Sequence, residues 1–575
     1  MIVPMKKIHL IVQKKDIEIV LARLRDFGDI HVEHQEPLIG YPVLERREEV
    51  QALAEAVETL KKYNIDIKQE KTDDWRETVL RLSELVSEIN KWKEEIIKQQ
   101  VMISKWMAWG DFDPADIRAL ARQGIYMQLW EKPAKDNASL PQGIIIQKIY
   151  SENGVDRCVV ISRDKIELPY TVIEPPAIGL SKMTANKEHL EAKIKEAEAT
   201  IHEHGKYFQF LQECFIQAQD DLQFEEVAKG MFKEDHLTVL KGYCPAEKVE
   251  ALQGLAKKEY WALMVEDPSE GDVVPTLLRN PKWIELVKPL FSMINILPGY
   301  KELDISPIFL LFFTMFVGML IGDAGYGVIY ALLFAFMQFK IGKKMNNPVF
   351  FILMYVLCIS TITWGVLTGV YFGQQWLPGS VKPLAPWLTD NINLQKLCFL
   401  IGAIHLSIAH IWRAIVRFPA VSFLSQVGWL VIIWGMYFMA NTLVLGAAFP
   451  DFGKIIFIVG MALIVLFTKP NINPLKAIGP GIGDLLLNVI NSFTDVVSYI
   501  RLFAVGLATI AVADAANNMS FFWIIFLHTL NILLAAMAIL VHGLRLNVLE
   551  FSGHLGMEWS GFQFNPFKSF KQKQV

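Results

Sequence analysis

The chain has 575 residues and a formal net charge of −4, with 52% hydrophobic and 20% charged residues. This length exceeds one ordinary domain, and the small net charge gives no indication of nucleic-acid binding. The cysteines show no CxxC or metal-ligand spacing, so we expect reduced, structural thiols and no metal site. They are Cys158, Cys214, Cys244, Cys358 and Cys398.

Charged residues are distributed unevenly along the chain. Residues 1–300 are rich in Lys, Arg, Asp and Glu, whereas region 308–551 contains seven acids, namely Asp323, Asp390, Asp451, Asp484, Asp495, Asp514 and Glu550. The segment Met1–Leu10 is short and carries two lysines, which is atypical of a signal peptide. We therefore predict a cytoplasmic domain over residues 1–300 and a membrane domain over residues 301–575.

Three parts of the N-terminal domain have the mixed pattern of small α/β lobes. We predict these lobes over residues 1–40, 106–180 and 230–270. The expected strands are Lys7–Val12, Asp29–Val32, Ile125–Leu129, Ile144–Ile149, Cys158–Ser162, Leu237–Tyr243 and Trp261–Val265. The expected helices are Asp16–Phe27, Asp116–Gln123 and Ala246–Lys258.

Two further segments of this domain repeat apolar residues at helical spacing. The second keeps a 3–4 alternation from Leu190 to Leu222, over four heptads with charged flanks. Such heptads predict a coiled coil, which we expect as an antiparallel hairpin of residues 44–105 with residues 181–225. A break near Thr72–Asp74 has the residue types that cap helices. A generic tether would show the same pattern.

Eight apolar stretches in the C-terminal part approach the roughly 20 residues that a membrane-spanning helix needs. They cover residues 304–322, 324–340, 348–372, 394–414, 422–447, 453–468, 481–513 and 518–553. The last two correspond to about 50 Å of helix against about 30 Å of hydrocarbon, so we expect them to tilt or protrude. In the third span, Gly365, Gly369 and Gly373 form a GxxxG row, which predicts close helix packing.

The connections between these spans differ in charge between the two sides. With a cytoplasmic N-terminus, more short-loop cations fall inside than outside, in agreement with the positive-inside rule. The inside set is Lys340, Lys343, Lys344, Arg413, Arg417, Lys469 and Lys476, and the outside set is Lys382, Lys396 and Lys454. The C-terminal tail, with Lys568, Lys571 and Lys573, would also lie in the cytoplasm.

Two arginines lie inside the predicted spans, Arg501 in the seventh and Arg545 in the eighth. A central membrane arginine costs about 2.5–3.5 kcal/mol on insertion scales, so it needs a compensating partner or a function. One interpretation is a structural ion pair with another helix. However, no position three or four residues from Arg501 is acidic, which also suggests a carboxylate on another subunit.

Polar residues near these arginines are candidates for lining an ion path. In the seventh span, Asn491, Thr494 and Ser498 share the Arg501 face, beside a second stripe of Asn488, Asp495 and Tyr499. In the eighth span the candidates are Asn531, His542 and Glu550. For Asn531 and His542, a hydrogen bond in helix packing is the simpler interpretation.

Several motifs resemble the membrane-embedded stator subunit of V/A-type rotary ATPases, known as subunit a or I, in its bacterial or archaeal form. The membrane motifs are Phe316–Gly327 (FVGMLIGDAGYG), Ser498–Ala508 (SYIRLFAVGLA), His542–Phe551 (HGLRLNVLEF) and Phe562–Phe567 (FQFNPF). The soluble motifs are Trp109–Asp113 (WGDFD), Gly242–Pro245 (GYCP) and Pro275–Pro281 (PTLLRNP). The resemblance covers nearly the whole chain in order, and the arginine motif is its most specific part.

The resemblance implies a fold and a mechanism. The fold would be α/β lobes on a long antiparallel coiled-coil hairpin, followed by an all-α domain of eight spans with two long tilted C-terminal helices. Arg501 would face the carboxylate of a rotating proteolipid ring, with Arg545 assisting, and H⁺ or Na⁺ would reach that carboxylate through two half-channels. The chain departs from many eukaryotic members at Thr509 and Ala535, so the outer half-channel would use other groups.

The same resemblance implies the partners and the setting. These are the proteolipid ring, peripheral stalk subunits anchored on the cytoplasmic domain, the central-stalk cap subunit of the ring and the lipid bilayer of a bacterial or archaeal plasma membrane. The chain has no GxxxxGK[ST] motif, so we expect no cofactor and no catalysis by this chain itself. The choice between H⁺ and Na⁺ and between pumping and synthesis stays open.

Two other classes of protein share parts of this pattern. A stand-alone secondary transporter also places charges at mid-membrane, but it predicts broken helices and an internal repeat. A structural or signalling protein could use the coiled coil, but it would have no use for Arg501. Co-purification of a small, two-helix ring protein would separate these classes.

Overall fold

The computed structural model describes residues 1–38, 40–62, 70–71, 74–134, 143–152, 154–164, 166, 171–345, 348–373, 382–468 and 474–570. Within it, the side chains of residues 343–345, 474–481 and 484 are not described. Thr72, Asp73, Lys469, Lys571 and Lys573 lie outside the described residues, as do the side chains of Lys343, Lys344 and Lys476.

The chain forms two compact units. One contains residues 1–10, 29–31 and 242–566, and the other contains residues 11–28, 32–241 and 567–575. The predicted domain boundary at residue 300 and the limits of the lobes stay predictions.

The α/β character of the N-terminal part is confirmed. Its strands are β1 (Met5–Gln13), β2 (His31–Glu33), β3 (Tyr126–Pro133), β4 (Ile145–Glu152), β5 (Val155–Ser162), β6 (Thr171–Ile173), β7 (Phe232–Glu234), β8 (Leu237–Pro245) and β9 (Ala262–Glu266). One sheet has the order β4-β5-β3-β6, and the other has the order β2-β8-β1-β9 with β7 beside β8. In β5, residues alternate between half-buried and buried, as expected for a strand with one face on a core.

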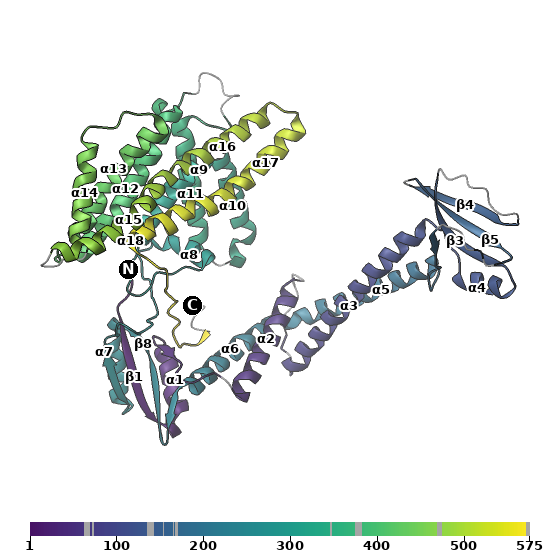
Figure 1. Cartoon of the computed structure of the whole chain (residues 1–575). Coiled ribbons are helices and arrows are strands. Elements are labelled where there is room, and N and C mark those ends of the chain that lie inside the picture. The colour runs from purple at the N-terminus through teal and green to yellow at the C-terminus, as the bar shows by residue number, and fades with distance from the viewer. Residues whose placement is uncertain are drawn as a thin grey trace. The chain divides into compact units, whose positions relative to one another are not determined.

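Long helices follow the predicted heptads. The helices of this region are α1 (Ile17–Phe27), α2 (Tyr41–Lys62), α3 (Trp75–Met107), α4 (Pro114–Arg122), α5 (Leu180–His204), α6 (Phe208–Gly230) and α7 (Val249–Lys258). α2 packs on α6 and α3 packs on α5, around a shared apolar core that includes Leu53, Leu82, Ile201 and Leu211 (Figure 1). Supercoiling of these helices stays a prediction.

The predicted cap before α3 falls on Asp74. Its carboxylate accepts hydrogen bonds from the backbone N–H groups of Arg76, at 2.8 Å, and Glu77, at 3.4 Å. These bonds satisfy two of the N–H groups that a helix leaves unpaired at its start. The cap therefore fixes where α3 begins.

A surface ion pair outside the membrane helices provides a pH-dependent prediction. Lys7 donates a 2.7 Å hydrogen bond to Asp272, which lowers the pKa of that carboxyl group from 3.8 to about 2. Because the folded-state pKa lies below the ordinary value, this stabilising contribution is complete above about pH 4 and is lost as the pH falls toward 2. We expect Lys7→Met to raise the Asp272 pKa, measured as stronger carboxyl labelling of Asp272 at pH 3 by mass spectrometry.

The C-terminal part is helical. Its helices are α8 (Lys288–Ile294), α9 (Ser306–Ile321), α10 (Ala324–Met345), α11 (Pro348–Thr368), α12 (Asn391–Arg417), α13 (Phe423–Leu445), α14 (Gly453–Phe467), α15 (Pro474–Ser498), α16 (Ile500–Asn517), α17 (Phe521–Ala538) and α18 (Ser552–Leu555). Two π-helical segments, Ile539–Gly543 and Leu546–Phe551, connect α17 to α18. Figure 1 shows α16 and α17 running obliquely past the other apolar helices.

Six helical stretches of the described residues are long and apolar enough to cross a membrane. α9 and α14 are also apolar, but they have 16 and 15 residues, which is about 24 Å of helix. The count of eight spans therefore stays a prediction. The two long stretches are present, with 33 residues over Leu485–Asn517 and 35 over Phe521–Leu555.

The start of α9 and the end of α18 lie at the same side of the helical part. Trp559 N–H donates a 3.1 Å hydrogen bond to the carboxylate of Glu302, and Gly561 N–H donates at 3.2 Å to the carbonyl of Leu297. A chain that starts and ends on the same side of a membrane crosses it an even number of times, so this arrangement is compatible with an even number of membrane spans. The side of the membrane on which the C-terminus lies stays a prediction.

The predicted glycine row on the third span is wrong beyond its first member. α11 ends at Thr368, and Gly369 and Gly373 follow it with φ of +74° and +86°, a backbone conformation that suits glycine. Gly365 does mediate close packing, because a Cβ atom there would overlap the backbone nitrogen of Ala324. The spacing was that of a helix, but the chain turns at Gly369.

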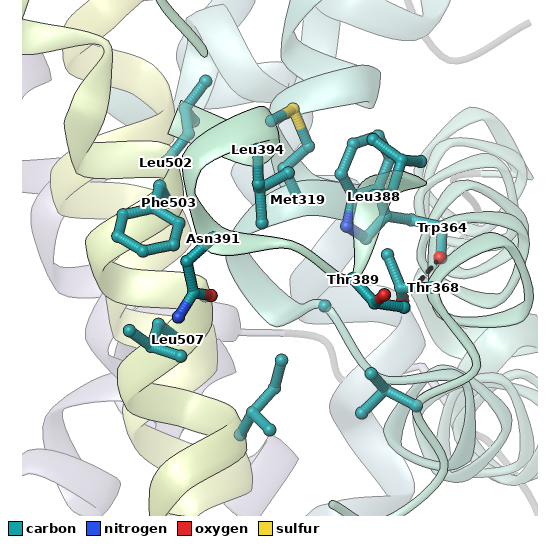
Figure 2. A pocket seen from close by; sticks show the side chains of 14 residues that line it. Met319, Trp364, Thr368, Leu388, Thr389, Asn391, Leu394, Leu502, Phe503 and Leu507 are labelled. Carbon is teal, nitrogen blue, oxygen red and sulfur yellow. Dashed lines mark hydrogen bonds between the residues drawn. The ribbon is translucent and has the colours of Figure 1, made fainter. Parts of the chain in front are cut away.

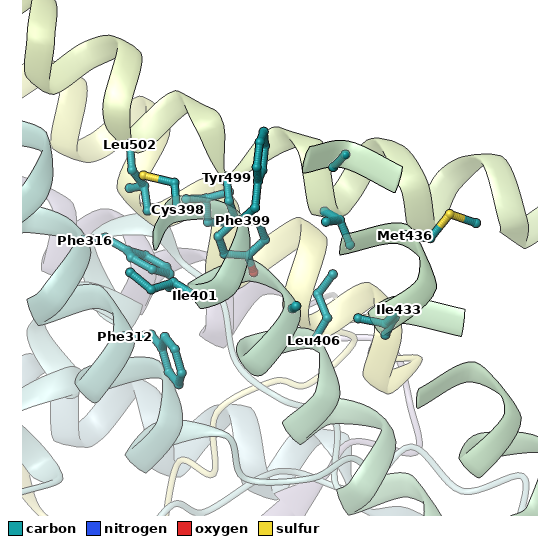
Figure 3. Close-up of a cluster of buried hydrophobic side chains, with 14 of the residues drawn as sticks. Phe312, Phe316, Cys398, Phe399, Ile401, Leu406, Ile433, Met436, Tyr499 and Leu502 are labelled. Carbon is teal, nitrogen blue, oxygen red and sulfur yellow. The ribbon is translucent and has the colours of Figure 1, made fainter. Parts of the chain in front are cut away.

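A buried core joins α9, α12, α13, α15 and α16. Figure 3 shows Phe312, Phe316, Phe399 and Tyr499 within this cluster. These side chains are at most 6% exposed. Packing on several helices therefore holds the junction between α15 and α16, where Tyr499 lies. This core therefore fixes the position of Arg501, two residues after Tyr499.

Candidate functional site

Both predicted arginines approach the same carboxylate. Arg501 Nη2 lies 3.7 Å from Glu550 Oε1, and Arg545 Nε lies 3.4 Å from the same oxygen. The Glu550 side chain is 3% exposed, whereas Arg501 is 20% exposed and Arg545 is 54% exposed. One buried carboxylate therefore faces two guanidinium groups.

The π-helical segment explains how Glu550 reaches Arg545. Residues five apart lie about 140° apart around an α-helix, whereas the i→i+5 bonds of a π-helix bring them to one side. Leu546–Phe551 is π-helical, and this turn connects the two residues. No feature of the sequence predicted this geometry, although Glu550 is the only acid of the predicted eighth span.

Charge compensation of Arg501 is incomplete within the described residues. Arg501 Nη1 and Glu550 Oε2 are both buried, and neither has a hydrogen-bond partner there. Glu550 is a partner in the same chain that the sequence did not indicate, because it lies on a different helix from Arg501. This carboxylate is shared with Arg545, so the cluster carries an excess of one positive charge.

A polar cavity of about 450 Å³ lies beside α15, on the N-terminal side of Arg501. Three of the candidates line it, Asn488, Asn491 and Asp495, together with His410, Arg413, Arg417, Gln426, Ser492 and His554. It lies at the end of α12 that carries Arg417. The histidines were missed from the sequence because their place on the cavity depends on packing between separate helices.

A second, smaller pocket of about 70 Å³ lies beside α16, on the C-terminal side of Arg501. Figure 2 shows Leu502, Phe503 and Leu507 of α16 on one side, with Thr389 and Asn391 nearby. Asn391 is the first residue of α12, whereas the polar cavity reaches its last residue, Arg417. The two cavities therefore lie toward opposite ends of α12. In the sequence, Arg501 falls between the α15 residues that line the polar cavity and the α16 residues that line the smaller pocket.

Four other candidates lie away from both cavities. Tyr499 is buried in the core, and its hydroxyl lies 2.8 Å from His405 Nδ1. Thr494 is exposed and donates a 3.0 Å hydrogen bond to the carbonyl of Ile490 on its own helix. Ser498 and His542 are half-buried, the latter on the first π-helical turn.

Asn531 belongs to a hydrogen-bonded network that joins α10, α16 and α17. It donates hydrogen bonds to the Tyr326 hydroxyl at 3.0 Å and to the carbonyl of Thr509 at 2.8 Å. His528 Nδ1 lies 2.7 Å from the same hydroxyl, and its Nε2 lies 3.1 Å from Asn517 Oδ1. These contacts support the helix-packing interpretation of Asn531.

Asp323 fixes the turn between α9 and α10 next to this network. Its fully buried carboxylate accepts hydrogen bonds from the backbone N–H groups of Tyr326, Phe372 and Gly373, at 2.9–3.1 Å. We expect Asp323→Ala to destabilise the protein by about 3 kcal/mol or more, because it leaves buried N–H groups unpaired. Thermal unfolding of the purified protein checks this, with Asp323→Asn as the milder control; equal stability of Asp323→Ala and the unmodified protein would refute it.

Among the described residues, no three of His, Cys, Asp and Glu gather so that they could hold a metal ion. The chemistry that the described residues do provide consists of titratable side chains, the guanidinium groups of Arg501 and Arg545, and the two cavities.

Comparison with known proteins gives relatives that match along the whole chain. The chain is 30% identical over 623 residues to V-type ATP synthase subunit I of Borreliella burgdorferi, with 100% of both chains covered. It is 30% identical over 626 residues to V-type ATP synthase subunit I 1 of Treponema pallidum, with 99% of this chain and 100% of the relative covered. No family model matches.

The solved structures that match include the cytoplasmic N-terminal domain of subunit I, homolog of subunit a, of V-ATPase. It covers 45% of this chain and 99% of that one, at 14% identity and a TM-score of 0.21.

Proposed function

The chain belongs to the family of V-type and A-type ATP synthase subunit I, and from this we propose that it is the membrane stator subunit of a rotary ATPase. In this role it provides fixed half-channels through which H⁺ or Na⁺ reaches and leaves the carboxylate of a rotating proteolipid ring. It translocates the ion and does not itself catalyse ATP hydrolysis or synthesis.

The placement of Arg501 between two separate cavities supports this proposal. The polar cavity uses α15 residues 488–495 and the smaller pocket uses α16 residues 502–510, so neither continues past the arginine along the chain. A fixed positive charge between two half-channels repels a cation that would otherwise cross directly. It also favours the ionised form of a ring carboxylate that arrives beside it, which drives release of the ion.

The incomplete compensation of Arg501 supports a carboxylate partner on another subunit. Glu550 is shared between two guanidinium groups, and Arg501 Nη1 is left without a partner among the described residues. A ring carboxylate would neutralise the excess charge. Arg545, which is more exposed, would assist at the edge of the same cluster.

The surface of α16 beyond Arg501 is suited to a moving neighbour. Ala504 and Ala508 lie on the Arg501 face and are exposed. Small side chains let a second helix approach closely, as membrane helix interfaces require. We propose that helices of the ring pass over this face.

The remaining partners follow from the same proposal. Peripheral stalk subunits bind the cytoplasmic domain and resist torque, and the central-stalk cap subunit reaches the ring. The membrane is a bacterial or archaeal plasma membrane, with both termini in the cytoplasm.

Photo-crosslinking tests the proposed ring contact. A photo-reactive residue at Ala504 should yield an adduct with the proteolipid of the purified complex. The matched control carries the photo-reactive residue at Ile458, a position on α14 that is 63% exposed. Equal adduct yield at both positions, or none at Ala504, would count against the proposal.

A further inference from the structure

An apolar cavity of about 250 Å³ lies among α8, α9, α10, α11 and the end of α17. Phe313 and Leu353 line it and are fully buried, whereas Met293 and Leu540 line it and are 55% and 41% exposed. The cavity therefore has a buried floor and an exposed rim. It shares no lining residue with the two cavities beside Arg501, so it is a separate feature of the helical part.

The polar groups among its lining side chains are already used within the chain. The hydroxyl of Tyr330 donates a hydrogen bond to the carbonyl of Ile532, and the hydroxyl of Thr361 donates one of 3.0 Å to the carbonyl of Leu357. Cys358 adds a thiol, which is only a weak hydrogen-bond donor. Apolar cavities stay dry and accept apolar ligands, so these walls suit a hydrocarbon occupant.

The length of the cavity matches half the thickness of a bilayer. Its lining residues on α11 run from Phe350 to Thr361, which is about 16 Å of helix, whereas the hydrocarbon core of one leaflet is about 15 Å deep. Residues of α8 line one end, and α8 packs on the first turn of α9, with 5.0 Å between the ring centroids of Phe291 and Phe309. The cavity therefore begins beside α8 and has about the depth of one leaflet.

The chain around α8 has the side chains of a membrane–water interface. Trp283 is 62% exposed, and Lys282 and Lys288 are exposed next to it in the sequence. Lys288 Nζ lies 3.8 Å from Glu285 Oε1, but its side chain is 67% exposed. Tryptophan is enriched at this interface and lysine attracts anionic headgroups, so the α8 end of the cavity suits the polar part of a lipid.

We propose that this cavity holds one acyl chain of an anionic membrane phospholipid, whose headgroup lies beside α8. The walls support this occupant, because α10, α11 and the stretch Phe521–Leu555 are each long and apolar enough to cross a membrane. A protein helix does not fit, because its diameter is about 10 Å and a volume of about 250 Å³ spread over about 16 Å is much narrower. The inference goes beyond the proposed ion path.

A chain in this cavity would contact the first π-helical segment. Ile539 and Leu540 belong to that segment and line the cavity. An occupant supplies the van der Waals contacts that the lining side chains lack across an empty space. The lipid would thereby support the segment that leads to Arg545.

Photolabelling of the purified complex tests the site. Phosphatidylglycerol with a diazirine in its acyl chain is added, and adducts are mapped by peptide mass spectrometry. Met354 lines the cavity, and Leu332, 66% exposed on α10 and outside the lining, is the reference for ordinary surface lipid. We expect Ala536→Phe, which fills the cavity, to lower the Met354 adduct relative to Leu332 by about tenfold, since about two methylene groups lose their place.

Matched controls make the result specific. Ala538→Phe adds the same ring at a half-buried position of α17 outside the cavity lining, and it should leave the Met354 adduct unchanged. Phosphatidylglycerol with the diazirine in its headgroup should label Lys288 and spare Met354. If Ala536→Phe does not assemble, Met293→Trp, which narrows the rim, carries the same test.

Three outcomes would overturn the lipid site. They are no Met354 adduct in the unmodified complex, an undiminished Met354 adduct in the filled variant, and labelling of Met354 by the headgroup probe as strong as by the acyl-chain probe. Each of them leaves the role of Arg501 standing, because that role is tested by ion uptake.

Discussion

Replacing Arg501 with alanine should abolish ion uptake by the assembled complex. At about 4 Å and an effective dielectric of about 20, the attraction between a guanidinium group and a carboxylate is about 4 kcal/mol. Losing this attraction would lower the equilibrium constant for release of the ion from the ring carboxylate by about a thousandfold. The measurement is ATP hydrolysis and ion uptake recorded together in vesicles, testing H⁺ and Na⁺ in turn.

Two variants make this result specific. Arg501→Lys keeps the charge but loses the planar fork that can face two carboxylates, so it should retain part of the uptake. Arg545→Ala removes the more exposed guanidinium group and should reduce uptake less than Arg501→Ala. If Arg501→Ala assembles and transports at near-normal rates, Arg501 is a structural ion pair with Glu550, and the proposed mechanism is wrong even though the family is right.

Replacing Glu550 with glutamine should strongly destabilise the helical part. It removes the carboxylate within ion-pair distance of both arginines and leaves Arg501 half-buried without compensation. Breaking a buried pair from one side costs about 3–5 kcal/mol, and the exposure of Arg545 places this site toward the lower value. The apparent unfolding temperature of the purified complex should fall accordingly.

A double variant tests whether charge balance is the cause. In Glu550→Gln with Arg545→Gln, one cation and one anion are lost together, so part of the stability should return. Glu550→Asp keeps the charge on a shorter side chain and should be milder than Glu550→Gln. A single Glu550→Gln variant as stable as the unmodified protein would show that the pairing in this cluster contributes nothing.

Most elements were predictable because their signals are local. Alternation in β5 and helical spacing in α3 and α5 follow from which side of an element is buried, and this leaves a pattern in neighbouring residues. Arg501 could be singled out because a charge inside an apolar stretch is costly whatever surrounds it. The glycine row failed because helical spacing at Gly369 and Gly373 does not reveal where α11 ends.

The partners of the candidate residues were not predictable in the same way. Asn488 and Asp495 were recognised as polar positions, but the cavity that joins them to His410 and His554 depends on helices up to 144 residues apart. Tyr499 was a candidate on the same stripe of the predicted seventh span, and it is buried against His405. Whether a polar side chain faces a cavity or a core depends on which helix packs against it.

The sequence by itself determined the two-part composition of this protein, its long apolar helices and the position of two arginines inside them, because hydrophobic periodicity and the cost of a buried charge act on the chain locally. Only the tertiary structure decided that Glu550 is shared by Arg501 and Arg545, that the residues before and after Arg501 line two different cavities, and that two histidines and Asp495 line the same one. These features depend on π-helical register and on packing between distant helices, and neither leaves a periodic pattern in the residues.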